Sequence, residues 1–307
     1  MLNGANDTGE MKRNFSFRLF ICNFATCEQE TKTDMIGFAN AKINLGLDIV
    51  RRRPDGYHDI VTVFYPIKLN DVVEVVPAAG EQTTLTCYGR PIDCPPEKNL
   101  MMKACRLMQE QYGLPHVDMY IYKHIPDGAG LGGGSSDASK VMLLMNEMFS
   151  AGASLDDLAR LSAKIGADCP FFIHNTPMLA TGIGDVLSPC EVSLRGKWLV
   201  VVKPAVSVPT KVAYANVTPA QPVTPIDEII KLPAGQWQGL LKNDFEPSVM
   251  AEFPIISSIK QTLLDGGAVY ASMSGSGSAV YGIFDSAKLA EDVTNNFTGC
   301  DKYVMEL

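Results

Sequence analysis

The glycine run between residues 126 and 136 is the part of this sequence best suited to chemistry, because it could bind phosphate. It reads Pro-Asp-Gly-Ala-Gly-Leu-Gly-Gly-Gly-Ser-Ser. Glycine lets a backbone approach a ligand closely, and the free amides and dipole at the start of a helix favour an anion. The loop therefore predicts nucleotide binding, provided that a strand enters it and a helix leaves it.

The segments on either side of the loop have the required periodicities. Residues 116–123 alternate apolar with polar or amphipathic side chains, as a strand does. Residues 136–149 place apolar side chains at the i, i+3, i+4 and i+7 positions of one helical face: Val141, Leu144, Met145 and Met148. The sequence thus predicts a strand, a phosphate loop and a helix in succession.

Two other interpretations of the loop are disfavoured. A flexible linker is not expected between a strand and an amphipathic helix. A Walker A loop is excluded, because the chain contains no G-x-x-x-x-G-K-[ST] pattern. The hydroxyls of Ser135 and Ser136 come where a phosphate or its Mg²⁺ would lie, which favours a nucleoside triphosphate.

A dinucleotide-binding fold is the sharper rival. Gly128, Gly130 and Gly133 satisfy the G-x-G-x-x-G spacing, although that match alone is weak. Such a fold also needs an acidic residue at a strand end about 20 residues later. Asp156 and Asp157 have about this spacing but lie at a helix start. The nucleoside triphosphate interpretation is therefore preferred.

Three further clusters could contribute chemistry, although each has an ordinary explanation. Lys42 and Asn44 lie on the same side of a predicted strand, where a lysine is more often solvated than catalytic. Asp168 follows a predicted helix end, and aspartate is common in such turns. Residues 274–278, Ser-Gly-Ser-Gly-Ser, could form a loose hairpin. Each cluster alone carries little weight.

The remaining elements predict an α+β protein, because strands and helices do not alternate regularly. Strands are expected in residues 36–77, 198–202, 268–273 and 279–284, with a turn at 53–56. Helices are expected at 99–112, from Ser154 to a stop at Gly166, and at 254–264. Residues 204–225, with five prolines, predict a long rigid loop.

The composition excludes several classes of protein. A net charge of −8 and a pI near 5.1 argue against a nucleic-acid partner. No apolar run is long enough to span a bilayer, so no membrane partner is expected. The eight cysteines form no C-x-x-C pair and the four histidines are scattered, which indicates a reducing, cytoplasmic location and no structural metal site.

The chain is predicted to have two domains behind a leader. Residues 1–34 indicate a disordered or non-native leader, since regular periodicity begins only at Ile36. Residues 35–195 would form an N-terminal domain with the glycine loop, and residues 196–307 a C-terminal domain. A monomer or weak homodimer is expected.

Taken together, these features resemble the GHMP kinase superfamily. The resemblance is carried by residues 39–45, 52–58, 126–136, 166–172 and the loop at Ser274, which occur in family order over nearly all of the chain after Met35. The Asp-Gly-Tyr-His sequence at 55–58 singles out the branch that acts on a cytidyl diphosphate sugar alcohol of the non-mevalonate isoprenoid pathway. The chain departs from the family in its leader and at Cys169, where many members carry valine.

The resemblance implies a fold and an activity. The fold would be that of a two-domain GHMP kinase, with a ribosomal protein S5 domain 2-like N-terminal domain, a ferredoxin-like C-terminal domain and the active site in the cleft between them. The activity would be transfer of the γ-phosphoryl of ATP, with Mg²⁺, to a small alcohol. Homoserine- or mevalonate-type kinases and a non-catalytic nucleotide-binding protein are the alternatives.

The resemblance also assigns site residues. Asp168 would be the base and Lys42 its partner. Asn44, Tyr57, His58, Tyr214, Ser276 and Gly277 would lie on the substrate side, with Tyr214 stacking on cytosine. Asn99 would lie near adenine. The phosphates of ATP would be bound by Pro126, Asp127, Gly128, Ala129, Gly130, Leu131, Gly132, Gly133, Gly134, Ser135 and Ser136.

Overall fold

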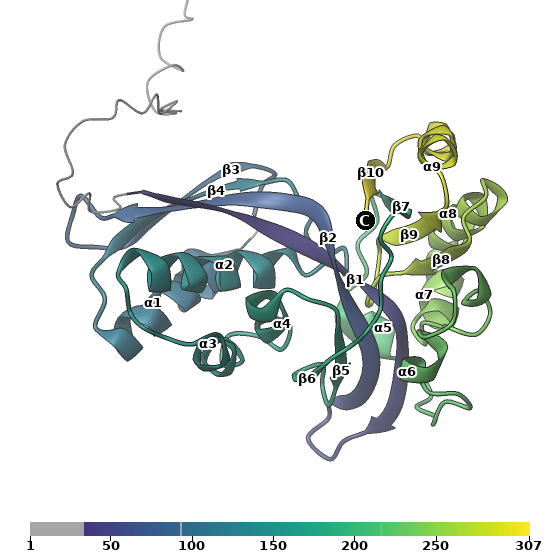
Figure 1. Cartoon of the computed structure of the whole chain (residues 1–307), viewed down its shortest axis with the longest axis horizontal. Helices are drawn as coiled ribbons and strands as arrows, with labels where there is room; N and C mark the ends of the chain where they lie inside the picture. Colours follow the sequence, from purple (N-terminus) through teal and green to yellow (C-terminus); the bar gives the residue numbers. More distant parts are fainter. Residues whose placement is uncertain (1–33, 93, 216) are drawn as a thin grey trace, which may run out of the picture. The chain divides into compact units, whose positions relative to one another are not determined.

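Two β-sheets with helices packed on them make up the structure, a computed structural model that describes residues 34–92, 94–215 and 217–307 (Figure 1). The predicted leader lies outside the described residues except for Asp34. Strands of the first sheet end at Pro189 and those of the second begin at Trp198. The predicted domain boundary at residue 195 falls between them and stays a prediction.

The first sheet has six strands: β1 (Met35–Arg52), β2 (His58–Pro77), β3 (Thr84–Gly89), β4 (Val117–Lys123), β5 (Met178–Thr181) and β6 (Val186–Pro189). Their order is β3-β4-β2-β5-β6, with β1 paired to β2. The series of short strands expected in residues 36–77 is instead one long antiparallel hairpin, β1 and β2, joined at the predicted turn. Three register shifts in this hairpin break the alternation, which explains why the sequence suggested several strands.

The helices of the first half are α1 (Leu100–Tyr112), α2 (Gly133–Met148), α3 (Leu155–Ser162) and α4 (Cys169–His174), after a 3₁₀ turn, η1 (Pro96–Lys98). In Figure 1, α1 and α2 lie along one face of the sheet. A capping box between Ser154 and Asp157 starts α3 as predicted, but α3 ends at Ser162, well before Gly166. Helix α2 begins at Gly133, within the glycine run and before the predicted helical segment at 136–149. The sequence did not indicate this earlier start, because the first turn of α2 carries no apolar side chain.

The second sheet is antiparallel and has the order β10-β7-β9-β8. Its strands are β7 (Trp198–Lys203), β8 (Tyr270–Met273), β9 (Val280–Phe284) and β10 (Asp301–Glu306). The accompanying helices are α5 (Thr210–Ala215), α6 (Ile226–Ile229), α7 (Glu246–Glu252), α8 (Pro254–Asp265) and α9 (Ala287–Val293), with 3₁₀ turns η2 (Ala234–Gln236) and η3 (Thr294–Asn296). The predicted loop at 204–225 is wrong in one part, because α5 forms within it after Pro209.

Strand β1 contributes to three hydrophobic clusters in turn. Ala39 packs with α1 and α2 of the first half. Ile43 and Leu45 pack against residues of β7 and β9. Leu47 and Ile49 pack in the cluster that contains α7 and α8. One strand therefore connects the hydrophobic core of the first half with the cores that contain elements of the second half.

The far part of β1 is bonded to residues 242–244. Leu47 N–H donates to the Lys242 carbonyl at 2.8 Å, and Asp244 N–H donates to the Leu47 carbonyl at 2.9 Å. A carboxylate oxygen of Asp244 accepts the Ile49 amide at 2.7 Å. The neighbouring Asp48 is buried, and its Oδ2 has no hydrogen-bond partner.

No helix in the described residues combines the length and the apolar character needed to cross a membrane.

Replacing Asp48 by asparagine is expected to stabilise the protein at neutral pH. Burial, with the nearby Asp244 carboxylate, raises the pKa of Asp48 to about 6, against the opposing effect of Lys242. Because the folded value lies above the unfolded one, the contribution of Asp48 to stability is present below pH 4 and is lost as the pH rises through 6. Asp48→Asn should therefore gain about 1 kcal/mol in unfolding free energy at pH 8 and little at pH 4.

Urea unfolding at the two pH values measures this difference. The exposed Asp292 of α9 supplies the control, and Asp292→Asn should change stability equally little at both pH values. An Asp48→Asn protein with the same pH dependence as the wild type would contradict the prediction.

Candidate active site

The glycine loop is folded tightly against a loop of the second sheet. Gly128, Gly130 and Gly132 all have positive φ, at 61°, 73° and 72°. A Cβ at Gly130 would lie 2.0 Å from the carbonyl oxygen of Ser274. The Ser274 hydroxyl donates to the Gly130 carbonyl at 2.8 Å. The predicted glycine loop and the predicted Ser274 loop are thus in direct contact.

The same loop also contacts β1. The Lys42 amide donates to the Leu131 carbonyl at 2.9 Å. A Cβ at Gly132 would lie 2.7 Å from Cζ of Phe172 and 3.2 Å from Cγ of Lys42. Gly132 is the N-cap of α2, so Lys42 lies beside the point where the loop becomes a helix.

The buried Lys42 ammonium is held by specific partners. It donates to Oδ1 of Asn44 at 2.6 Å, and it lies 4.9 Å from the centre of the Phe64 ring. The Asn44 amide donates in turn to the Thr62 hydroxyl at 3.0 Å. Burial lowers the pKa of Lys42, while the nearby Asp168 carboxylate opposes that fall. Asn44, predicted on the substrate side, is placed here to orient Lys42.

Asp168 is the N-cap residue of α4. Its side chain makes no capping hydrogen bond. Its Oδ2 lies 3.8 Å from Nζ of Lys42, and 34% of the side chain is exposed. A carboxylate that is partly exposed, close to an ammonium and free of capping duty can accept a proton from a bound alcohol.

A cavity of about 230 Å³ joins these groups. The predicted residues that line it are Lys42, Asn44, Gly130, Gly132, Asp168, Tyr214 and Ser276. Gly277 does not line it but donates its amide to Ser274 in the adjoining turn, at 3.0 Å. Residues predicted from five separate stretches of sequence therefore meet in one cavity.

Two aromatic residues of the predicted substrate side, His58 and Tyr214, stack on one another beside this cavity. The rings of His58 and Tyr214 are parallel to within 19°, with centres 4.8 Å apart. Phe245 meets Tyr214 edge-on, with centres 4.7 Å apart. Tyr57 is 61% exposed in the turn before β2, and neither Tyr57 nor His58 is among the residues that line the cavity.

Asn99 is placed at the start of α1, away from this cavity. Its side chain accepts the Met101 amide at 2.9 Å and caps the helix. Its predicted role near adenine stays a prediction.

Sequence reasoning missed several residues of the site. The cavity is also lined by Leu47, Ile60, Phe64, Ile183, Thr210, Phe245 and Gly275. Ile60 and Phe64, with Thr62 between them, alternate on β2, and Asn44 pairs with Phe64 in the hairpin. The period of two was visible in the sequence, but the pairing that turns this face toward Lys42 was not.

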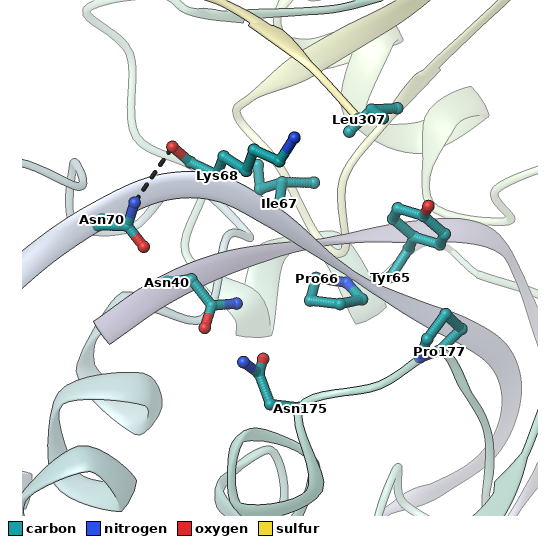
Figure 2. A pocket seen from close by; sticks show the side chains of 9 residues that line it. All are labelled: Asn40, Tyr65, Pro66, Ile67, Lys68, Asn70, Asn175, Pro177 and Leu307. Atoms are coloured by element: carbon teal, nitrogen blue, oxygen red, sulfur yellow. Dashed lines mark hydrogen bonds between the residues drawn. The ribbon is translucent and has the colours of Figure 1, made fainter. Parts of the chain in front are cut away.

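A second cavity, of about 390 Å³, lies elsewhere on the β1–β2 hairpin. Figure 2 shows Asn40 on β1, Lys68 and Asn70 on β2, and Asn175 just past the end of α4. None of the predicted catalytic, nucleotide or substrate residues lines it. The larger of these two cavities therefore does not contain the predicted site residues.

Comparison with known proteins identifies the family. A model described as "GHMP kinases N terminal domain" matches residues 99–176, and one described as "GHMP kinases C terminal" matches residues 226–299. A 4-diphosphocytidyl-2-C-methyl-D-erythritol kinase of Parabacteroides distasonis is 50% identical over 251 residues, which are 82% of this chain and 92% of that protein. This chain belongs to the GHMP kinase family.

A further relative and two solved structures are also similar to this chain. The kinase of the same name from Bacteroides thetaiotaomicron is 49% identical over 82% of this chain and 92% of its own. A crystal structure of a 4-(cytidine 5'-diphospho)-2C-methyl-D-erythritol kinase has a TM-score of 0.75 at 32% identity, covering 88% of this chain and 98% of that one. The Methanococcus jannaschii mevalonate kinase, at 11% identity, 90% and 99% coverage and a TM-score of 0.67, shares the fold. The predicted α+β GHMP kinase fold is confirmed.

Proposed function

We propose that this GHMP kinase transfers the γ-phosphoryl of ATP to the 2-hydroxyl of 4-diphosphocytidyl-2-C-methyl-D-erythritol, in the non-mevalonate isoprenoid pathway. The similar proteins from Parabacteroides and Bacteroides bear the name of this kinase at about half identity. One structural observation carries the proposal. A single cavity contains Lys42, Asp168, two glycines of the loop and the ring of Tyr214.

The site residues divide the work of phosphoryl transfer, which depends on positioning and charge neutralisation more than on covalent chemistry. The glycine loop and the N-terminus of α2 would bind the phosphates through backbone amides. Asp168 would accept the proton of the attacking hydroxyl. The Lys42 ammonium, 3.8 Å from this carboxylate, would stabilise the negative charge that develops during the transfer.

The donor set fits Mg²⁺ held largely by ATP. The described residues contain no group of three or more His, Cys, Asp or Glu side chains that could hold a metal ion. Mg²⁺ in kinases typically keeps one or two protein oxygens and takes the others from phosphates and water. The hydroxyl of Ser135 or Ser136, both in the first turn of α2, would supply such an oxygen. When bound, the ion would neutralise charge on the phosphates.

Tyr214 would bind the cytosine ring. His58 stacks on one face of Tyr214 and Phe245 meets it edge-on, so the ring is held in one orientation. An aromatic platform of this kind suits a nucleobase, whose flat face stacks on it. Neither a homoserine nor a mevalonate substrate would need it.

Release of ADP in a coupled assay tests the proposal directly. The cytidyl diphosphate substrate, homoserine and mevalonate are offered in parallel with ATP and Mg²⁺. Turnover is expected only with the first. Turnover with homoserine or mevalonate would replace the proposed substrate, and ADP binding without turnover on any of the three would point to a non-catalytic nucleotide-binding protein.

Tyr214→Ala is expected to raise KM for the cytidyl diphosphate substrate by about 10- to 100-fold, because stacking on one base is worth roughly 1–3 kcal/mol. KM for ATP should be nearly unchanged. Tyr214→Phe, which keeps the ring, is the matched control and should behave like the wild type in both. Steady-state kinetics with each substrate varied in turn measures the two constants. If KM for the cytidyl diphosphate substrate is equal in the alanine and phenylalanine variants, Tyr214 does not bind cytosine.

A further inference from the structure

A buried cluster of charged side chains lies against the glycine loop, outside the cavity of the proposed chemistry. It consists of Asp71 on β2, Lys123 at the end of β4 and Asp137 in α2, all at least 97% buried. The Lys123 ammonium donates to Oδ2 of Asp71 at 2.6 Å and to Oδ2 of Asp137 at 2.8 Å. One cation therefore connects β2, β4 and α2.

Asp71 fixes the entrance of the loop. Its Oδ1 accepts the backbone amides of His124 and Ile125, at 2.5 and 2.7 Å. These two residues lie between the end of β4 and Pro126, where the glycine run begins. Asp71 thus sets the direction in which the chain leaves the strand.

Lys123 and Asp137 fix the exit of the loop. Asp137 lies one turn into α2, which begins at Gly133. A Cβ at Gly133 would lie 2.9 Å from Nζ of Lys123 and 3.0 Å from Cγ2 of Ile125. The missing side chain lets the first turn of α2 rest on the ammonium. The entrance and the exit of the loop therefore meet at Lys123.

The surroundings of Asp137 act on the pKa of its carboxyl in opposite directions. Burial raises the pKa of Asp137, and Asp71 adds to this rise, while Lys123 opposes it. Oδ1 of Asp137 is buried without a hydrogen-bond partner. The partly exposed Asp127, whose Oδ1 lies 3.9 Å from Lys123, is the other carboxylate in contact.

We propose that Lys123 and Asp137 are positioning residues that hold the two ends of the glycine loop at the spacing that ATP phosphates require. Both side chains are buried, so they act through the backbone of the loop. The inference rests on the proposed function for the identity of the nucleotide. Nucleotide binding without turnover tests it separately.

Asp137→Ala separates α2 from the ammonium and leaves the Lys123–Asp71 pair intact. We expect this variant to raise the Kd for Mg-ADP by about tenfold, the scale of one lost buried hydrogen bond to a charged group. Asp137→Asn keeps an acceptor for Lys123 and should stay within about threefold of the wild type. Isothermal titration calorimetry on the full chain gives these constants, and steady-state kinetics should show the change in KM for ATP but not for the alcohol.

A control variant separates positioning from a general loss of stability. Lys260→Met breaks a partly buried ion pair between α8 and α7, in which Nζ of Lys260 lies 2.6 Å from Oε2 of Glu246. It should lower the melting temperature and leave the Kd for Mg-ADP unchanged. Lys123→Met, which removes the cation itself, is the second variant and should weaken Mg-ADP binding at least as much as Asp137→Ala.

The outcomes are decisive. Unchanged Mg-ADP affinity in a folded Asp137→Ala or Lys123→Met protein overturns the proposal. So does an equal loss of affinity in Lys260→Met, or a failure of asparagine at position 137 to restore binding. If the alcohol substrate is wrongly assigned, turnover fails in the wild type while the pattern of Mg-ADP affinities among the variants still stands.

Discussion

Asp168→Asn and Lys42→Ala are each expected to lower kcat by about 100-fold or more, the scale of a lost general base or charge-stabilising group. Asparagine keeps the shape of the Asp168 side chain but cannot accept the hydroxyl proton. Loss of Lys42 removes the ammonium 3.8 Å from that carboxylate and leaves Asn44 without its donor. Steady-state kinetics at saturating ATP and alcohol measures kcat.

The two variants should differ in their pH dependence. Asp168→Asn, which lacks the proposed base, and Lys42→Ala, which keeps it, should give pH–rate profiles of different shape. Lys68→Ala is the control, because Lys68 is an exposed lysine of the second cavity (Figure 2) and should keep full activity. Near wild-type kcat in both Asp168→Asn and Lys42→Ala would exclude this site as the centre of the reaction.

Gly130→Ala is the second substitution expected to have a large effect. The new Cβ would lie 2.0 Å from the Ser274 carbonyl oxygen, and the backbone has a φ of 73°. The backbone carbonyl cannot swing away as a flexible side chain would, so the loop or the 274–278 turn must shift. We expect a loss of about 2–4 kcal/mol in unfolding free energy from overpacking and backbone strain. KM for ATP should rise at least about tenfold, because the phosphate loop is displaced.

Gly113→Ala is the matched control for this prediction. Gly113 caps α1 with a φ of 65°, but a Cβ there meets nothing within 4 Å. It should therefore show the cost of a left-handed alanine alone, about 1 kcal/mol, with KM for ATP unchanged. Urea unfolding and ATP kinetics on both variants separate strain from collision. Equal behaviour of the two would show that the contact with Ser274 has no effect.

The parts of the fold that local periodicity governs could be predicted from the sequence. Residues 117–123 alternate and form β4, and residues 141–148, which carry the predicted apolar face, form the second half of α2. Helix α5 could not be predicted, because six residues in a proline-rich stretch carry almost no pattern. The single hairpin of β1 and β2 was obscured by its bulges.

The site shows a similar division. The glycine loop was predicted from its own residues and their flanks, and the roles of Lys42 and Asp168 through the family resemblance. The structure places Lys42, Asp168 and Gly130 and Gly132 of the loop around one cavity. The contribution of β2, with Ile60 and Phe64, depends on an antiparallel register that one sequence does not specify. The Asp71–Lys123–Asp137 cluster spans 66 positions between its first and last members, and no local motif signals it.

Because β1 contributes residues to three hydrophobic clusters, it affects how the chain folds. Ala39 belongs to a core completed by α1 and α2, whereas Leu47 and Ile49 belong to one completed by α7, α8 and β9. Its partners in α7, α8 and β9 follow about 200 or more positions later in the sequence, so this core cannot be completed until most of the chain has been synthesised. Contacts of such long range slow folding and expose apolar strands to aggregation in the meantime. The hydrophobic cores of both halves of this kinase include residues of β1. The two halves should therefore unfold as one cooperative unit.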